Sequence, residues 1–149
     1  MSITVPELDS ELSGTELPGD TTTITGFESA IADHALLAPA PDGQNAHPLW
    51  YLIIALRGMG ISVDQLCELA AKLPEDTLLF GTCEIEQLVP LVVGSTYRTT
   101  ARITETDRRT TRDGSVLDSI TVDVRLYDDL DVEAGSVISV YLFKRGTRQ

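Results

Sequence analysis

The sequence predicts an α+β protein in which an antiparallel sheet wraps around one buried helix. Two observations lead to this prediction. Residues 48–57 are apolar on nearly every side, and from about residue 78 onward apolar residues recur with the period of two that strands require. With 149 residues, of which 42% are hydrophobic and 23% charged, the chain is long enough for one domain with a single core. Since no other segment could cover the helix, we expect the sheet to do so.

The first 20 residues mix Pro, Gly, Ser and acidic side chains without sustained periodicity. This composition predicts a flexible acidic lead-in over residues 1–20, followed by a single domain over residues 21–149. Within that domain we expect a short strand over residues 21–25 and a helical turn over residues 26–32. A loop should follow, because turn-forming residues gather at Pro39, Pro41 and Gly43.

The segment Pro-Leu-Trp-Tyr-Leu-Ile-Ile-Ala-Leu-Arg, residues 48–57, leaves no polar face for water and therefore predicts a central, buried helix. Pro48 is expected at its first position, where the missing N–H of proline costs nothing. Gly58 and Gly60 are expected to end the helix.

A second, amphipathic helix should follow the central one. Ser62 and Gln65 have the spacing of a capping box, in which each residue bonds the backbone N–H of the other. Apolar residues then recur at helical spacing as far as Pro74, at Val63, Leu66, Cys67, Ala70 and Leu73.

Three consecutive strands are predicted in the C-terminal half of the chain. Apolar and polar residues alternate over residues 97–104 and 120–126, and residues 137–143 are apolar on both faces. Asp113-Gly114 is a turn signal in the first connection, and the acid-rich stretch 128–135 forms the second. Connections this short force neighbouring strands to run antiparallel.

Charge and composition exclude several kinds of partner. The chain carries 23 acidic and 11 basic residues, a net charge of −12, so we expect neither nucleic acid nor an anionic membrane as a partner. No run of 18 apolar residues and no secretory signal pattern is present, which predicts a cytoplasmic protein. Cys67 and Cys83 match no zinc or disulfide spacing, and we expect no metal and no cofactor.

Three segments together form a recognisable pattern. Ala46-His47-Pro48 opens the apolar helix, Pro90-Leu91-Val92-Val93-Gly94 follows a strand, and Tyr141-Leu142-Phe143-Lys144-Arg145-Gly146 closes the last strand. This pattern resembles the hotdog fold and, over residues 24–146, the MaoC-like hydratase/dehydratase group within it. The closing Leu-Phe-Lys-Arg-Gly is similar to the end of the N-terminal, non-catalytic half of double-hotdog members.

The resemblance implies reversible syn addition of water across the C2–C3 bond of an acyl thioester carried by coenzyme A or by an acyl carrier protein. In that group a His and an Asp from a D-x-N-P-x-H loop handle the proton and the water, and such positioned groups contribute about 10²–10⁴-fold to the rate. The string is absent here, and the nearest candidates are Asp33 and His34, which are adjacent. We expect His34 as the general acid/base, with Asp33 as its weaker second.

The family also uses an amide at the start of the central helix to polarise the thioester carbonyl. Here Pro48 stands where relatives often carry glycine, and proline has no amide hydrogen. The N–H of Leu49 or a group of a partner chain would have to substitute. His47 is then expected to contact substrate or to cap backbone amides, and Trp50 to face the substrate, the core or a dimer contact.

Three arginines gather in the hairpin before Gly114, namely Arg108, Arg109 and Arg112. Guanidinium groups form charge-assisted bonds with phosphate, so these three could meet the phosphates of coenzyme A or of a carrier-protein arm. A solvated hairpin tip is the alternative.

Three functions follow from the resemblance and stay open at this point. The first is a dimeric MaoC-like hydratase or dehydratase that uses His34. The second, motivated by Pro48 and the missing loop motif, is a non-catalytic subunit that shapes the acyl pocket of a catalytic hotdog partner. The third is an acyl thioesterase on the same fold. The assembly would be a homodimer or a heterodimer with another hotdog chain.

Overall fold

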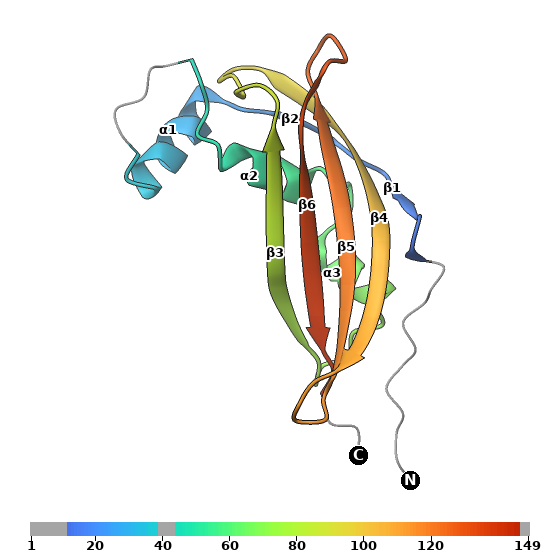
Figure 1. Ribbon diagram of the computed structural model, residues 1–149. Helices are drawn as coiled ribbons and strands as arrows, with labels where there is room; N and C mark the ends of the chain where they lie inside the picture. The colour runs from blue at the N-terminus through green and yellow to red at the C-terminus, as the bar shows by residue number, and fades with distance from the viewer. Residues whose placement is uncertain (1–11, 39–43, 147–149) are drawn as a thin grey trace.

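The computed structural model describes residues 12–38 and 44–146. Two short strands and a helix come first, then two more helices, and finally four long strands (Figure 1). In chain order these are β1 (Glu16–Leu17), β2 (Thr21–Thr23), α1 (Gly26–Ala35), α2 (Trp50–Arg57), α3 (Val63–Leu69), β3 (Thr77–Gln87), β4 (Thr96–Thr110), β5 (Val116–Tyr127) and β6 (Glu133–Lys144).

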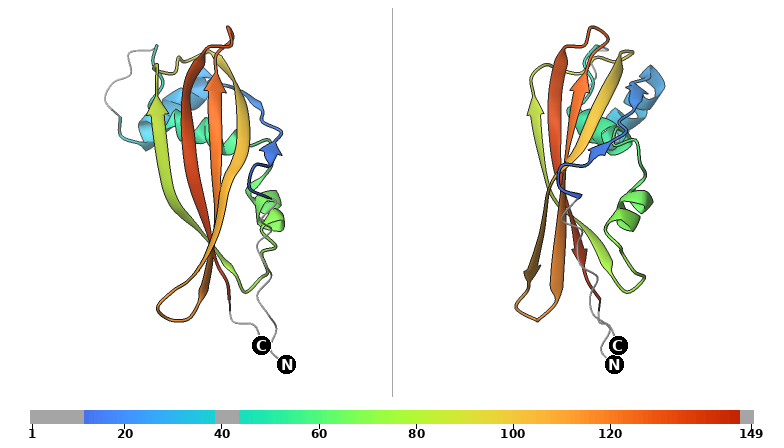
Figure 2. Two further views of the ribbon diagram at one scale, coloured as in Figure 1. Left: turned by 45° about the vertical axis from the view of Figure 1, so that its right-hand side comes forward. Right: turned by 90° about the vertical axis from the view of Figure 1, so that its right-hand side faces the viewer.

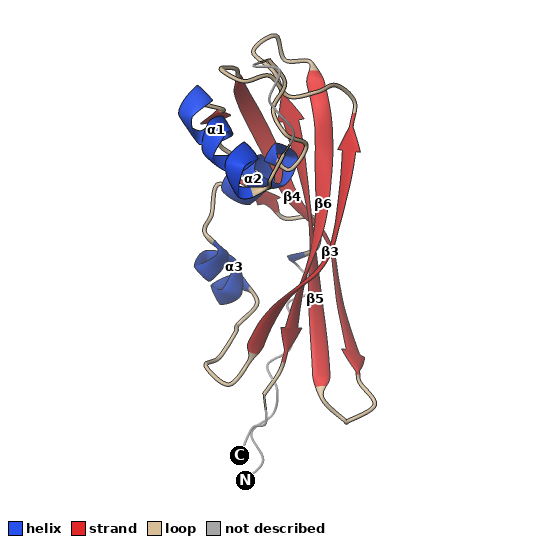
Figure 3. Ribbon diagram, turned by 90° about the vertical axis from the view of Figure 1, so that its left-hand side faces the viewer, coloured by secondary structure: helices blue, strands red, loops and turns tan. Residues whose placement is uncertain are grey.

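The strands form one sheet, and all its pairings between these strands are antiparallel. The order is β1-β4-β5-β6-β3, with β2 also paired to β4. The sheet is strongly twisted, and the helices lie on one side of it, with α2 lying across the sheet (Figures 2 and 3). The α+β prediction, with an antiparallel sheet around a central helix, is therefore confirmed.

Helix α2 buries one side against the sheet. Trp50, Tyr51, Ile54 and Ala55 are each 3% exposed or less, and their spacing places them on one face of the helix. Fully burying a large apolar side chain contributes about 1.5–3 kcal/mol, so this face is a main source of stability. The other side is less covered, because Leu56 is 38% exposed. The predicted burial of the helix thus holds for its sheet-facing side in the single chain.

Helix α2 begins later than predicted. Pro48 lies in a turn before the helix rather than at its first position, and Leu49 is the N-cap. The predicted end is confirmed, since Gly58 is the C-cap. A Cβ atom on Gly58 would lie 2.6 Å from side-chain atoms of Thr99, so the close approach of the helix end to β4 requires glycine there.

The capping box of the second helix is present, with both reciprocal bonds between Ser62 and Gln65. Helix α3 nevertheless ends at Leu69, before Pro74, because Ala71 adopts the left-handed conformation with φ of 53°. Conversely, α1 is longer than the helical turn predicted over residues 26–32, because it continues to Ala35, and the Leu36 N–H still bonds the Ala32 carbonyl.

The N-terminal segment is partly built into the sheet. Residues 12–20, predicted as part of a flexible lead-in, contain β1 and the buried side chains of Leu12 and Leu17. Residues 1–11 of that lead-in, and the loop predicted at residues 39–43, lie outside the described residues.

The predicted alternation in the C-terminal half is confirmed. The buried positions of β4 include Tyr97, Thr99, Ala101 and Ile103, and those of β5 include Ile120, Val122, Val124 and Leu126. Asp113-Gly114 forms the turn between these strands, with Gly114 at φ of +84°. Strand β6 starts at Glu133, inside the connection predicted over residues 128–135, because its first residues pair with the ends of β3 and β5.

A buried ion network joins the end of β6 to β5 and to the segment after α3. The Arg145 guanidinium donates from Nε to Asp118 Oδ2 at 2.8 Å and from a terminal nitrogen to Asp76 Oδ2 at 3.0 Å, and all three side chains are 0% exposed. Arg145 also donates to the Ala70 carbonyl at 2.6 Å. Arg108 adds a bidentate contact to Asp118, at 2.6 and 2.8 Å. Burial opposes ionisation of the Asp118 carboxyl, but the hydrogen bonds from both arginines outweigh it and hold its pKa below the usual value.

We expect Asp118→Asn to be strongly destabilising, because it removes one of the two buried carboxylates that pair with Arg145 and the one that pairs with Arg108. Breaking a buried ion pair on one side costs about 3–5 kcal/mol. The matched control is Asp131→Asn, since Asp131 pairs with Arg98 at 3.2 Å but is 80% exposed, and exposed pairs contribute about 0–1 kcal/mol. Urea unfolding of the two variants checks the difference; equal losses would contradict it.

The contacts of Asp118 with Arg108 and Arg145 also make the free energy of unfolding depend on pH. Because the pKa of Asp118 is lowered on folding, its contribution is fully present above the unfolded-state pKa of about 3.9 and is lost as the pH falls through the lower folded-state value. The free energy of unfolding of the wild type should therefore drop below about pH 4 more steeply than that of Asp118→Asn. Parallel curves for the two proteins would show that Asp118 is not the group responsible.

Candidate functional site

The segment that leads into α2 is the candidate site, because the resemblance implies that a thioester carbonyl would meet the start of the central helix. This segment is held against the turn before β4. The Ala46 N–H donates to the Leu91 carbonyl at 2.8 Å, and the Val93 N–H donates to the Gln44 carbonyl at 2.8 Å. The position of the helix start is thereby fixed relative to the sheet.

The His47 side chain bonds the backbone just before the first turn of α2. Its Nδ1 accepts a hydrogen bond from the Leu49 N–H at 3.0 Å. The backbone carbonyls of His47 and Pro48 accept from the N–H groups of Trp50 and Tyr51, at 2.9 and 3.1 Å. Pro48 has no N–H to offer. The amide of Leu49, which could have replaced the missing donor, is therefore already bonded to His47.

Asp33 and His34 lie in the last turn of α1, where His34 is exposed and Asp33 half-buried. Successive helical residues point about 100° apart, so the two side chains diverge. Neither side chain has a hydrogen bond or ion pair among the described residues. The structure thus does not bring them together as an acid–base pair.

The three hairpin arginines are separated by the geometry of the strand. Arg108 is held by Asp118 on the inner face of the sheet, the face toward the helices. Arg109 is the next residue along β4, so its side chain points to the outer face. Arg112 is exposed in the turn that follows. The three side chains therefore do not form one phosphate-binding group.

Trp50 is a core residue of α2, 2% exposed, with the Arg57 guanidinium 5.9 Å from its ring centroid. Its indole Nε1 is buried and has no hydrogen-bond partner within the described part of the chain. Burial of this kind fits the core interpretation of Trp50 better than direct contact with a substrate.

Two tyrosines near α2 are buried, as expected for Tyr51 as a core or dimer-contact aromatic, but their contacts were not predicted from the sequence. The Tyr51 hydroxyl bonds the carbonyls of Val89 and Ala134 at 2.5 and 2.7 Å, which ties the first turn of α2 to the ends of β3 and β6. Tyr141 packs edge-on against Phe80 at 5.4 Å between ring centroids. Burial raises the pKa of each tyrosine to about 12, so both stay neutral near pH 7 and neither supplies a base there.

The start of α2 lies toward the β3 side of the sheet. Tyr51 connects this end to β3 and β6, whereas Gly58 at the other end meets Thr99 of β4. Strand β3 is the outermost strand on that side, and no strand of the described part pairs with its second edge (Figure 1). The candidate site therefore lies beside an open edge of the sheet.

Other ligand types find little support among the described residues. Cys67 and Cys83 are free and half-buried, and burial raises the pKa of the Cys67 thiol. Within residues 12–38 and 44–146 no group of three His, Cys, Asp or Glu side chains could hold a metal ion. None of the helices found there is long and apolar enough to cross a membrane.

Solved structures share this arrangement of sheet and helices. One is a hot-dog-like protein from Thermanaerovibrio acidaminovorans, 11% identical, with a TM-score of 0.56 over 90% of this chain and 85% of that one. The chain has the hotdog fold. A C-terminally truncated HadBC (3R-hydroxyacyl-ACP dehydratase) complex from Mycobacterium tuberculosis is 12% identical, with a TM-score of 0.67 over 88% of this chain and 96% of that one.

The ChsH1–ChsH2 complex from the same organism is similar to the chain as well. It is 11% identical, with a TM-score of 0.66 over 89% of this hotdog chain and 84% of that one. No family model matches the sequence, and no curated protein matches it. At these identities the similarity establishes the fold, and the function has to be argued from the residues.

We expect His47→Ala to loosen the start of α2, because it removes the side-chain acceptor of the Leu49 N–H. Loss of a side-chain-to-backbone hydrogen bond of this kind costs about 0.5–1.5 kcal/mol, and His47→Asn, which keeps a side-chain acceptor, should retain part of it. Hydrogen exchange of the Leu49 amide, read with urea unfolding, checks this. If the Leu49 amide exchanges equally slowly in wild type and His47→Ala, the capping role is wrong.

Proposed function

We propose that the chain is a non-catalytic hotdog subunit that shapes the acyl pocket of a catalytic partner in an acyl-thioester hydratase or dehydratase. The substrate class is an acyl thioester of coenzyme A or of an acyl carrier protein. The observation that carries the proposal is the closed start of α2, where Pro48 lacks an N–H and the Leu49 N–H is bonded to His47 Nδ1.

Carbonyl activation is what this chain lacks. A single well-placed donor to a developing oxyanion is worth about 2.7–4 kcal/mol of transition-state stabilisation. The N–H groups of Leu49, Trp50 and Tyr51 are all bonded within the chain, so a thioester oxygen could reach any of these three donors only by displacing its present bond. The divergence of Asp33 and His34 removes the second requirement, a convergent acid–base pair.

Strand β3 supports a role as a subunit. It is 11 residues long, contains no proline, and exposes Leu79, Phe80 and Ile85 by 44%, 47% and 41%. A long edge with unpaired backbone groups and apolar side chains favours pairing with another strand. A partner strand added along β3 would extend the sheet beside the start of α2 and bring the partner's residues to the candidate site. Both the HadBC and the ChsH1–ChsH2 structures are described as complexes.

The subunit proposal predicts that the isolated chain does not hydrate an enoyl-CoA. Loss of absorbance of the conjugated thioester measures hydration, and His34→Ala should behave like wild type because neither turns over. Hydration by the isolated chain that His34→Ala abolishes, in a protein that still folds, would overturn the proposal in favour of a hydratase using His34 and Asp33. Release of free thiol from an acyl-CoA panel would instead indicate a thioesterase.

The proposal also predicts an assembly that depends on β3. Native mass spectrometry of the tagged protein isolated from its own cells should show a second hotdog chain bound to this 16.2 kDa chain. Ile85→Lys should release the partner, because it places a charge on the inner face of the edge strand. Leu130→Lys is the control, since Leu130 is 78% exposed in the turn between β5 and β6. A wild-type protein that runs as a single chain would contradict the prediction.

A further inference from the structure

The outer face of the sheet, which points away from the helices, carries a hollow of about 320 Å³ that crosses all four long strands. We call it the Gly81 hollow. It is lined by Gly81, Thr82, Asp107, Arg109, Leu117, Ser119, Val140 and Leu142. The strand register places these residues in neighbouring rows, with Leu142 opposite Ser119 and Leu117 opposite Arg109. The hollow is separated from the candidate site at α2 by the thickness of the sheet.

The floor of the Gly81 hollow is apolar. Leu117 is 8% exposed although it lies outside the core cluster around α2, and Val140 and Leu142 are half-buried. Gly81 lies in a bulge where the pairing of β3 with β6 shifts register. A Cβ atom there would come within 3.1 Å of Leu142 side-chain carbons, so the glycine keeps this side of the hollow open.

The rim carries an available cation. The Arg109 side chain is exposed and has no hydrogen bond or ion pair with any residue that the structure describes, whereas the adjacent Arg108 is held by Asp118. Arg109 is therefore not required by the ion network, and its five N–H donors face solvent beside an apolar floor. Ser119 and Thr82 add hydroxyl groups nearby.

We propose that the Gly81 hollow binds a small amphipathic monocarboxylate, with its apolar tail on Leu117, Val140 and Leu142 and its carboxylate on Arg109. Pockets that bind small molecules combine an apolar lining with a few polar groups, and this volume is at the small end of their range. Asp107 lies two residues before Arg109 on the same face and disfavours a second negative charge. Together with the net charge of −12, this favours a monocarboxylate over a phosphate or a diacid.

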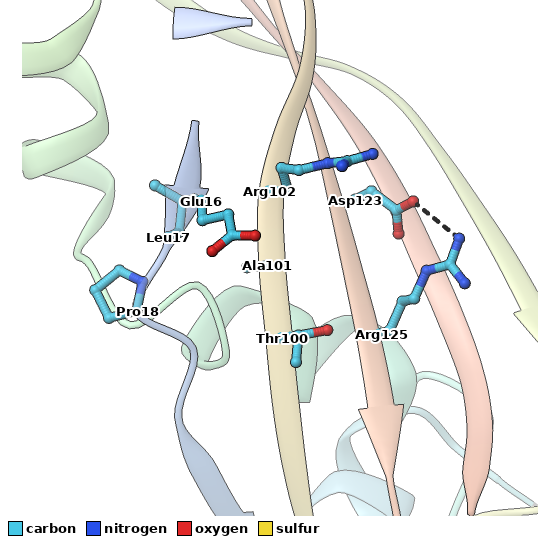
Figure 4. A pocket seen from close by; sticks show the side chains of 8 residues that line it. All are labelled: Glu16, Leu17, Pro18, Thr100, Ala101, Arg102, Asp123 and Arg125. Carbon is cyan, nitrogen blue, oxygen red and sulfur yellow. Dashed lines mark ion pairs between the residues drawn. The ribbon is translucent and has the colours of Figure 1, made fainter. Parts of the chain in front are cut away.

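A second hollow, at the β1 edge of the sheet, differs in its chemistry. It measures about 530 Å³, and its lining includes Glu16, Arg102, Asp123 and Arg125 (Figure 4). Asp123 and Arg125 pair there at 3.6 Å, and the acidic and basic side chains balance. Arg102 makes no ion pair with described residues, so it is a matched control for Arg109: the same residue type, on the same face of the same strand, beside a polar hollow.

The experiment is a titration of the full chain with octanoate, followed by two-dimensional NMR of backbone amides and methyl groups. We expect saturable shifts centred on Leu117, Val140 and Leu142. Arg109→Gln should weaken binding about tenfold or more, because it removes a charge-assisted contact. Gly81→Ala should also weaken it, because the added methyl group meets Leu142. Arg102→Gln should bind like wild type.

Two further probes separate recognition from simple apolar binding. Octylammonium has the same tail with the opposite charge, and inorganic phosphate has the charge without the tail; neither should shift the residues of the Gly81 hollow. The proposal is overturned if octanoate gives no saturable shifts there, if octylammonium binds as well, or if Arg109→Gln and Arg102→Gln have equal effects. Because none of these readouts involves hydration, the result is independent of the proposed subunit function.

Discussion

The burial of one face of α2 against the sheet is the constraint on which the rest of the molecule depends. An eight-residue helix with almost no polar side chain is unstable in water, so its position must be secured at both ends. The Tyr51 hydroxyl secures the beginning by bonding two strand-end carbonyls, and Gly58 secures the end by allowing contact with Thr99.

The same requirement shapes the candidate site. A helix start normally presents unsatisfied N–H groups, and these are what make it suited to binding a carbonyl or an anion. In this chain a turn and the His47 ring satisfy the N–H groups of Leu49, Trp50 and Tyr51, so these three amides are not free to bind a ligand. This fits the proposed function, in which the chain would contribute surface and shape to a site whose reactive groups come from a partner chain.

Features that depend on residues close together in the sequence could be predicted, and features that depend on contacts between distant residues could not. The apolar helix, the capping box at Ser62 and the alternation in β4 and β5 each arise from neighbours in the chain. The Arg145 network joins residues up to 75 positions apart, and no local sequence pattern predicts it. The separation of Arg108 from Arg109 is different, because the alternation of side chains along a strand already implied it. The bond from the Leu49 N–H to His47 depends on the turn at Pro48. That turn is held in place by the bond from the Ala46 N–H to the Leu91 carbonyl, which is distant in the sequence.

The order of strands has a consequence for how the chain acquires its structure. Strands β4, β5 and β6 follow one another along the chain and pair through short turns, whereas β3 must wait for β6, which lies some 50 residues later. Closing a long loop costs entropy, and this slows the pairing of strands that are distant in the sequence. We therefore expect the three-stranded meander of β4, β5 and β6 to form the folding nucleus and β3 to join last. The strand that the proposed function assigns to a partner contact would then also be the last to dock, which leaves its apolar side chains open to mispairing while the protein is being made.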